Sequence, residues 1–395
     1  MEVTRIFHSV GQGGFYTETF DDLPNKPMVV FDCGGKSSKL MKDYINSFLP
    51  TRSKATIEAV FISHLHDDHI NGLQHLIDRA NVKKIFLPQF NSNQLFDTIF
   101  YNAAYGTHTE NRNNLVFSLI NPTNTFRETT IIQVAEAIID SNYQNVSRSI
   151  QDGVSQTIAS GTPMALSNGW VYIPFNPPSK TPNFDKIKDQ DIKETLLSLY
   201  NNTNLYEQAT ALAKFVKSCT VKQCKELYKK MFGGIHNGQS MTLFSGLRNH
   251  DSNIEIGSHS FTPTCNRYQC PHWCDWFADL AEYKEDCIPT NFLYTGDYEA
   301  GEKAKMEELS SFYTKIEVWE TICGLQIPHH GSRKNYAKEL YNKRCYAIAS
   351  AGTSNKFHHP NIDTLINIFH QGCKPFVVTE DKSTIIMQYF RIYIQ

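Results

Sequence analysis

The chain has 395 residues, enough to bury a large core, and its 38 basic and 40 acidic side chains leave a formal net charge of −2. Proteins that hold long duplexes usually carry a clustered positive footprint, so this near-balance argues against tight non-specific DNA binding. No window approaches the roughly 20 apolar residues of a membrane span, and the N-terminus carries no apolar leader. We therefore expect a soluble, cytoplasmic protein without a membrane partner, whose ten cysteines are mostly reduced thiols.

The first 90 residues alternate between strand-like and turn-like segments. Apolar and β-branched runs predict strands at residues 3–10, 28–32, 57–63 and 84–88. Apolar residues at helical spacing predict a helix over residues 39–49 and a second one over residues 70–79.

The segment VFISHLHDDHINGL, residues 60–73, carries the clearest chemical signal, because His64, His66, Asp68 and His69 form a His-x-His-x-Asp-His pattern. Side chains alternate along an extended chain, so His64 and His66 project to the same side and can share one ion. Asp68 and His69 come after the chain turns, and we expect them to point at a second metal position nearby. Imidazole and carboxylate ligands suit Zn²⁺, Mn²⁺ or Fe²⁺, and two ions about 3.5–4 Å apart are typical of hydrolases. The alternative is a loop that is rich in histidine by chance.

The middle of the chain mixes strands and helices. Residues 129–139 predict a helix, and short strands are expected between 153 and 174. A proline-rich linker, residues 176–183, leads to a predicted helical insertion over 184–232. Its apolar stripe is typical of packing rather than of a cofactor site, although such an insertion could cap an active site and screen substrates by size.

The second half returns to strands. We expect strands at residues 240–245, 291–295, 315–319, 346–351, 375–379 and 384–393, and a helix at 362–370. Two strand-rich halves with helices outside predict an α+β fold, a four-layer αββα sandwich in which two mixed sheets pack face to face. The motifs are spread over most of the chain, so we expect one domain over 1–395, with the helical insertion 184–232 and a Cys-rich insertion 250–288. The sequence shows no internal repeat, so we do not expect a solenoid.

The Cys-rich insertion contains a second possible metal site. Its candidate ligands are Cys265, Cys270, His272, Cys274 and Cys287. The spacing is roughly that of a closed zinc site, but it lacks a C-x2-C pair. A structural zinc and unligated thiols both remain possible.

Three stretches together resemble the metallo-β-lactamase superfamily. Besides the histidine-rich segment, VVFDCGG (residues 29–35) resembles its second strand, where Asp32 would hold the metal loop by hydrogen bonds. FLYTGD (residues 292–297) resembles the strand whose terminal aspartate, here Asp297, bridges two metals. The resemblance implies the metallo-β-lactamase fold and two divalent metal ions, zinc or manganese.

Further motifs are similar to those of the competence-protein branch of this superfamily, which includes phosphorylcholine esterases. They are SVGQGG (residues 9–14), IPHHGS (residues 327–332) and NKFHHPN (residues 355–361). In IHNGQSMTL, Asn237 and Ser240 match an Asn-x-x-Ser element of this branch better than His236 does.

The resemblance implies a complete site. The implied metal ligands are His64, His66, Asp68, His69, Asp297, His330 and His359. The implied catalytic residues are Asp68, Asp297 and His329, with His329 acting as ligand, acid or orienter. Which members of the pairs His329/His330 and His358/His359 bind metal stays open. Ser332 and Asn355 are candidate substrate contacts.

The resulting functional prediction is a binuclear metal-dependent hydrolase that activates water. A phosphodiesterase or nuclease-like enzyme acting on phosphoesters or short nucleic acids is favoured, because the branch acts on phosphoesters. A hydrolase of a lactone, thioester or lactam is the second interpretation, and a non-catalytic metal-binding effector module is the third. The substrate, native metal, oligomeric state, protein partners and pathway stay open.

Overall fold

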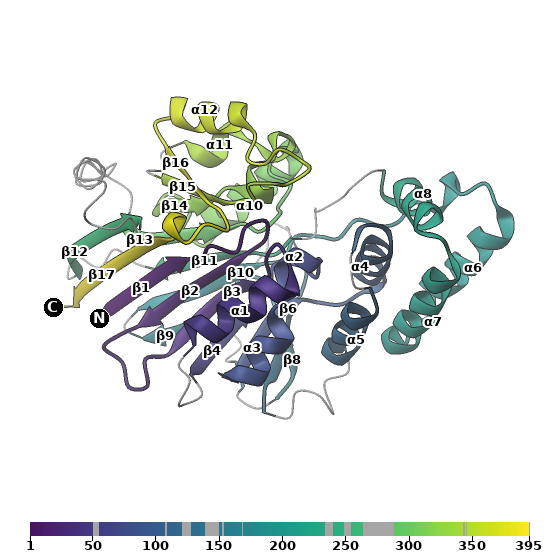
Figure 1. The fold of residues 1–395 in the computed structure, drawn as a ribbon, viewed down its shortest axis with the longest axis horizontal. Coiled ribbons are helices and arrows are strands. Elements are labelled where there is room, and N and C mark those ends of the chain that lie inside the picture. Colours follow the sequence, from purple (N-terminus) through teal and green to yellow (C-terminus); the bar gives the residue numbers. More distant parts are fainter. Residues whose placement is uncertain are drawn as a thin grey trace.

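A computed structural model gives the fold of this protein (Figure 1). It describes residues 1–395 except 50–54, 107–108, 121–127, 139–149, 152–153, 168, 234–239, 249–253, 264–287, 343, 345 and 395. His236, Asn237 and the five candidate ligands of the Cys-rich insertion therefore lie outside the described residues.

In the described part of the chain, ten strands form the first sheet, in the order β12-β17-β1-β2-β3-β4-β6-β7-β8, with β5 beside β4. Their bounds are β1 (Glu2–Phe7), β2 (Phe15–Phe20), β3 (Met28–Cys33), β4 (Thr56–Phe61), β5 (Asn81–Val82), β6 (Lys84–Pro88), β7 (Thr130–Val134), β8 (Gln156–Ile158), β12 (Ile254–Pro263) and β17 (Ile386–Ile394). Pairing is antiparallel from β12 to β3 and parallel from β3 to β8.

Seven described strands form the second sheet, in the order β16-β15-β14-β13-β11-β10-β9. They are β9 (Met164–Ser167), β10 (Trp170–Phe175), β11 (Thr242–Leu247), β13 (Ile288–Tyr294), β14 (Ile322–Gln326), β15 (Tyr346–Ser350) and β16 (Lys374–Val378). The strands from β13 to β16 are parallel, and the others pair antiparallel.

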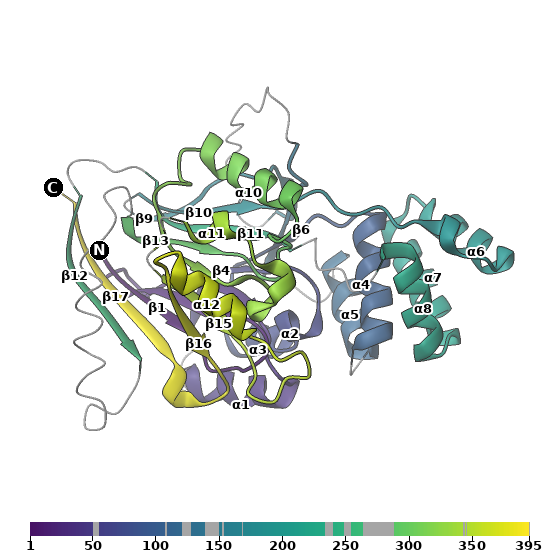
Figure 2. The same cartoon turned by 90° about the horizontal axis from the view of Figure 1, so that it is seen from above.

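The two sheets pack face to face through an aromatic core. Between ring centroids, Phe7 of the first sheet lies 5.2 Å from Phe292 of the second, and Phe31 of the first lies 4.9 Å from Tyr294 of the second. The outer face of the first sheet is covered by α1 (Ser38–Phe48) and α3 (Leu73–Arg79). That of the second is covered by α10 (Lys303–Lys315), α11 (Lys338–Tyr341) and α12 (Ile362–His370) (Figures 1 and 2). The α+β class and the αββα order of layers are confirmed.

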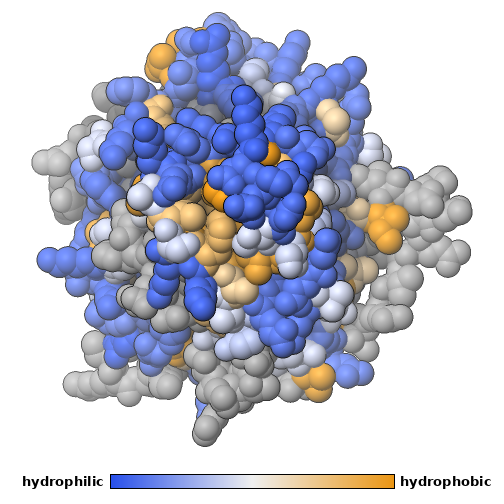
Figure 3. Space-filling model, turned by 90° about the vertical axis from the view of Figure 1, so that its right-hand side faces the viewer, coloured by the Kyte–Doolittle hydropathy of each residue, from blue (hydrophilic) through white to orange (hydrophobic). Residues whose placement is uncertain are grey.

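Five further helices pack together beside the sandwich, and we call them the helical module (Figures 1 and 2). They are α4 (Ser92–Tyr105), α5 (Thr109–Ile120), α6 (Gln190–Tyr200), α7 (Leu205–Ser218) and α8 (Val221–Phe232). The predicted helical insertion thus packs on a helix pair from much earlier in the chain. Figure 3 shows the molecule from the side on which the helical module lies. The surface there is mostly hydrophilic around a smaller hydrophobic area.

Two predicted elements are wrong. Residues 129–139 contain β7 instead of a helix, because Ile131 and Ile132 lie in a parallel strand that is buried on both faces and therefore lacks the alternation of a half-exposed strand. Residues 315–319 hold the end of α10 and a turn instead of a strand. The buried Val318 belongs to the hydrophobic cluster formed by the second sheet and the helices that cover it.

A buried polar network joins the two sheets. Arg5 Nε lies 2.7 Å from Glu18 Oε1, and both side chains are almost fully buried. The hydroxyls of Tyr172, Ser245 and Tyr294 donate to the same carboxylate at 2.6, 2.7 and 2.9 Å. Since the last three residues come from the second sheet, the carboxylate of Glu18 fixes how the sheets face each other.

Among the helices that the structure describes, none combines the length and apolar character needed to cross a lipid bilayer.

Candidate metal centre

The candidate site lies where loops leave the ends of strands in both sheets. The loop after β4 carries His64 and His66, and it runs into the short helix α2 (Asp67–Ile70). From the second sheet, Asp297 follows β13, and His330 sits in a tight turn after β14. Segments that are far apart in the sequence thus meet at one edge of the sandwich.

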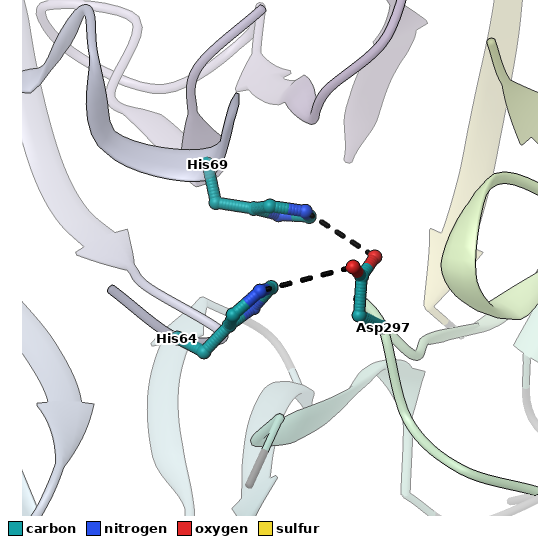
Figure 4. Close-up of side chains that lie close together, drawn as sticks. All are labelled: His64, His69 and Asp297. Atoms are coloured by element: carbon teal, nitrogen blue, oxygen red, sulfur yellow. Dashed lines mark ion pairs between the residues drawn. The ribbon is translucent and has the colours of Figure 1, made fainter. Parts of the chain in front are cut away.

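The carboxylate of Asp297 lies at the centre of this cluster. Its Oδ1 is 3.3 Å from Nε2 of His69 and 3.5 Å from Nε2 of His330. Its Oδ2 is 3.8 Å from Nε2 of His64, and both His64 and His69 point toward it (Figure 4). The carboxylate is therefore placed to be shared between two ligand groups.

Asp68 completes the other side of the cluster. Its Oδ2 lies 3.3 Å from Nε2 of His330, and its Oδ1 lies 4.0 Å from Nε2 of His69. Two sets of side chains each have their ligand atoms within 4.8 Å of one another and could hold a metal ion: His64, His69 and Asp297, and Asp68, His69 and His330. These sets share His69 and lie next to each other.

The Nδ1 atoms of the three central histidines are held in place by hydrogen bonds. Asp32 accepts from the backbone and hydroxyl of Ser63 at 2.7 and 2.8 Å, and its Oδ2 lies 2.8 Å from Nδ1 of His69. Because the Ser63 hydroxyl donates to Asp32, it accepts from Nδ1 of His64 at 3.0 Å. Nδ1 of His330 donates to the Ser350 carbonyl at 2.8 Å.

This arrangement leaves Nε2 of each imidazole directed into the cluster, as is usual for metal-binding histidines. The Nε2 atoms of His64, His69 and His330 are buried and make no hydrogen bond within the described part of the chain. Buried polar atoms normally have such a partner, so a group of three that face two carboxylates fits a divalent cation. The expected role of Asp32 in holding the metal loop by hydrogen bonds is confirmed.

The histidines of the site differ in whether their surroundings favour a positive charge. Burial disfavours it for two of them: it lowers the pKa of His64 well below its usual range and brings that of His66 to about 3. Burial also opposes a charge on His69, but the carboxylates around it, above all Asp297 and Asp32, outweigh burial and hold its pKa well above the usual range. For Asp68, the nearby His69 and His330 outweigh burial and lower the pKa of the carboxyl.

Two glycine-rich loops pack closely against the backbone of Asp68. Gly14 of SVGQGG donates its N–H to the carbonyl of Asp68 at 3.2 Å. A Cβ added to Gly13 or Gly34 would collide with that same carbonyl. Both glycine motifs identified in the sequence therefore allow a close approach of backbone under the metal loop.

The IPHHGS turn has a left-handed backbone. His329 and His330 have φ values of 47° and 55°, a region that non-glycine residues rarely adopt and that marks functional turns. The turn is held by a hydrogen bond from the N–H of His329 to the Gly296 carbonyl at 3.0 Å. It directs His330 into the cluster, while His329 stays 24% exposed at its rim, with Nε2 3.7 Å from Asp297 Oδ2.

The remaining predicted residues lie around this centre. His66 is buried with its ring centroid 4.4 Å from that of His64, but it belongs to neither of the two ligand sets. His359 is likewise in neither set, and its ring lies 5.3 Å from that of His329. Ser332, the last residue of IPHHGS, is buried. The ligand, catalytic and substrate roles of all these residues stay predictions.

Asn355 lies in the same region but is engaged within its own loop. Its amide donates to the carbonyls of Gly352 and His359 at 2.6 Å, and its Oδ1 accepts from the N–H of His359 at 2.8 Å. These bonds favour a role in shaping the loop that carries His359 over the predicted contact with substrate.

Three side chains around the site were given no role from the sequence. Asn335 bridges the site, because it accepts from Nδ1 of His329 at 3.2 Å and donates to the carbonyl of Tyr298 at 2.9 Å. The Ser240 hydroxyl, which had been matched only to a sequence element, accepts from the N–H of Asp297 at 3.0 Å. Tyr101 of α4 stacks on His66. The position of Asn335 just after IPHHGS and the Asn-x-x-Ser match at Ser240 were the usable signals.

Fold and site together define the class: a four-layer α+β sandwich with a buried histidine–aspartate cluster that could hold a metal ion. A family model described as the metallo-beta-lactamase superfamily matches residues 24–86, a stretch that contains β3, β4 and the histidine-rich segment. The fold is consistent with the metallo-β-lactamase fold, and the match supports the resemblance to that superfamily. It does not reach IPHHGS or NKFHHPN, so the resemblance to the competence-protein branch stays a prediction.

No match was found among curated proteins. Similar solved structures include unliganded yeast PDE1, with 10% identity over 97% of this chain and 92% of that one and a TM-score of 0.38. A long form RNase Z from yeast shows 8% identity over 96% of this chain and 36% of that one, with a TM-score of 0.33. Rubredoxin oxygen:oxidoreductase from Desulfovibrio gigas shows 11% identity over 95% and 91%, with a TM-score of 0.22. Scores this low do not bear on the activity of this chain.

Proposed function

We propose that this protein is a hydrolase with a dinuclear metal centre that cleaves phosphodiesters or short nucleic acids. The observation that supports the metal centre is the buried cluster in which the Nε2 atoms of His64, His69 and His330 face the carboxylates of Asp68 and Asp297. The preference for phosphodiesters over acyl compounds rests on the resemblance of IPHHGS and NKFHHPN to a branch acting on phosphoesters.

The two ion sites would draw on the two sets of side chains and on the sequence motifs. One would use His64 and Asp297, with His66 added from the His-x-His spacing. The other would use Asp68, His69, His330 and Asp297, with His359 as a further candidate from the sequence. Two bound divalent ions, zinc or manganese, would supply a hydroxide near neutral pH and neutralise the leaving oxygen.

The residues at the rim would handle the substrate. His329 is partly exposed, its Nδ1 donates to Asn335 and its Nε2 lies 3.7 Å from Asp297 Oδ2, so the imidazolium form could give its Nε2 proton to the leaving oxygen. Ser332 stands next to it as a candidate donor to a phosphate oxygen. Asp297 and Asp68, the predicted catalytic carboxylates, face the Nε2 atoms of the surrounding imidazoles and would hold the ions together with them.

The substrate class can be tested with purified protein supplied with Mn²⁺ or Zn²⁺. We expect cleavage of bis-p-nitrophenyl phosphate and no cleavage of nitrocefin or of a lactone. Turnover of nitrocefin or of the lactone alone would establish the acyl-hydrolase alternative. Metal binding without turnover of any of the three substrates would favour an effector module.

The residues can be tested with alanine substitutions. We expect Asp68→Ala and His66→Ala to abolish phosphodiester turnover, because each removes a group that holds or surrounds the ions, while the folded protein is retained as judged by circular dichroism. His75→Ala is the matched control: this histidine bonds to Asn46 at the surface, away from the cluster, and should leave the rate unchanged. Wild-type rates in both site variants would show that the assigned centre is wrong.

A further inference from the structure

His66 differs from the other histidines of the candidate centre in how it is held. Hydrogen bonds fix Nδ1 of His64, His69 and His330, whereas no described residue hydrogen-bonds the imidazole of His66. Its ring lies flat against Tyr101 instead, with the centroids 3.5 Å apart and the planes only 6° from parallel. It also meets the ring of His64 nearly edge-on, at 77°. Stacking therefore does for His66 what hydrogen bonds do for the others.

Tyr101 belongs to α4, and the helical module holds it in place. Its ring lies 5.2 Å from Tyr105 of the same helix and 5.9 Å, edge to face, from Tyr228 of α8. Tyr228 is fully buried, and its hydroxyl donates to Asp97 Oδ1 at 2.7 Å. A continuous set of contacts thus runs from α8 through α4 to His66.

The contact between α4 and the metal loop extends beyond one ring pair. Gln94, Asp97, Thr98 and Tyr101 follow the i, i+3, i+4, i+7 spacing of one helix face. The first three line a small pocket whose other wall includes His64, Leu65, His66 and Pro88. These four residues of α4 therefore lie beside the loop that carries the first two histidines.

We propose that Tyr101 is a positioning residue, through which the helical module fixes the imidazole of His66 for binding a metal ion. Of the proposed function, this inference requires only that a divalent ion binds at the cluster. The substrate and the reaction do not enter it. Loss of the ring would let the imidazole rotate, so the ion nearest to His64 and His66 would bind more weakly while the other ion is retained.

Metal binding itself is the test, with Co²⁺ as the probe in the full chain stripped of metal by a chelator. We expect Tyr101→Leu to weaken one of two Co²⁺ binding steps by about 10-fold or more, the range seen when groups that orient metal ligands are removed. Tyr101→Phe keeps the ring and should bind Co²⁺ as the wild type does. The visible absorption spectrum of bound Co²⁺ should change in the leucine variant only, because it reports the geometry of the ligands.

Phe100→Leu is the matched control for stability. Phe100 is buried on the same helix, but its ring packs against Phe96 and Phe215 within the helical module. Its loss should lower the unfolding temperature of the metal-free protein and leave Co²⁺ affinity unchanged. If Tyr101→Leu binds Co²⁺ like the wild type, or if Phe100→Leu weakens binding equally, Tyr101 does not position His66.

The two proposals fail in different ways. A wild-type protein that binds no Co²⁺ would overturn both. A protein that binds Co²⁺ with the expected dependence on Tyr101 but cleaves no phosphodiester would overturn the proposed function and support this inference.

Discussion

At the scale of single residues, protons compete with metal ions for the same nitrogens. His69 is surrounded by carboxylates that raise its pKa despite burial, and the pKa of His330 is raised as well, because Asp297 and Asp68 outweigh burial there. A metal ion needs the lone pair of each imidazole. The cluster therefore attracts a positive charge, which can be a proton or a metal ion.

We expect metal binding near pH 7 to release protons. His69 has a raised pKa in the folded protein, so it is protonated there and must lose that proton to an entering ion. In the metal-free protein, the protonated His69 stabilises the fold fully below its unfolded pKa of about 6.5. This stabilisation is lost as the pH rises through the pKa that His69 has in the folded protein, which is higher.

Calorimetric titration with Zn²⁺ in two buffers of different ionisation enthalpy measures the released protons directly. Affinity should rise with pH over the same range. Equal binding heats in the two buffers would contradict the expectation, because they would show that no proton moves.

The candidate site was only partly predictable at this scale. The His-x-His-x-Asp-His spacing places four residues by local geometry alone, and the structure brings three of them, His64, Asp68 and His69, into the two ligand sets. Tyr101 could not be predicted, because its contact with His66 depends on how a distant helix packs and leaves no mark in the local sequence.

At the scale of elements, helices with a clean amphipathic pattern were predicted well. The helices of 184–232 follow their apolar stripe, and Leu212 and Val216 are buried as that stripe requires. α4 was missed, because one of its faces packs on other helices while the opposite one lies against the metal loop. Its polar Gln94 and Asn102 are therefore buried too, and the contrast between faces is lost.

The start of α8 offers a test of a single helix end. Thr220 forms a capping box with Gln223: its hydroxyl accepts from the N–H of Gln223 at 3.3 Å, and its own N–H donates to the Gln223 side chain at 2.8 Å. We expect Thr220→Ala to lower the free energy of unfolding by about 1 kcal/mol. Urea denaturation of the metal-free protein measures this loss.

Thr210→Ala makes the same chemical change inside α7. Thr210 is exposed, and its hydroxyl donates to the carbonyl of Tyr206 one turn earlier. This variant should stay within about 0.5 kcal/mol of the wild type. If the two variants lost equal stability, the cap would not be the cause.

At the scale of the whole molecule, the layers were predictable and their exact registration was not. Alternating strand and helix signals were enough for an αββα sandwich, because each apolar face must be covered. The pairing of β1 with β17, which joins the two ends of the chain, depends on contacts almost 390 positions apart, such as Glu2 with Arg391. Local patterns carry no information on such pairs.

The buried carboxylate of Glu18 joins the two sheets. We expect Glu18→Gln to lower the free energy of unfolding by about 3–5 kcal/mol, because it leaves the buried Arg5 without its opposite charge. Denaturation followed by tryptophan fluorescence measures the loss. Glu58→Gln, in the partly exposed pair with Lys83, is the matched control and should cost about 1 kcal/mol or less. Similar losses in both variants would mean that burial of the pair does not matter.

The placement of the cluster between the two halves has a consequence for the protein in a cell. Asp68 and His69 follow strand β4 of the first sheet, whereas Asp297 and His330 follow strands β13 and β14 of the second. An ion held by both pairs therefore links the two sheets of the sandwich. Ligands that bind only the native state shift the unfolding equilibrium by mass action. Under metal starvation, more of the protein would open and become a substrate for proteases, so its abundance would follow the supply of the ion.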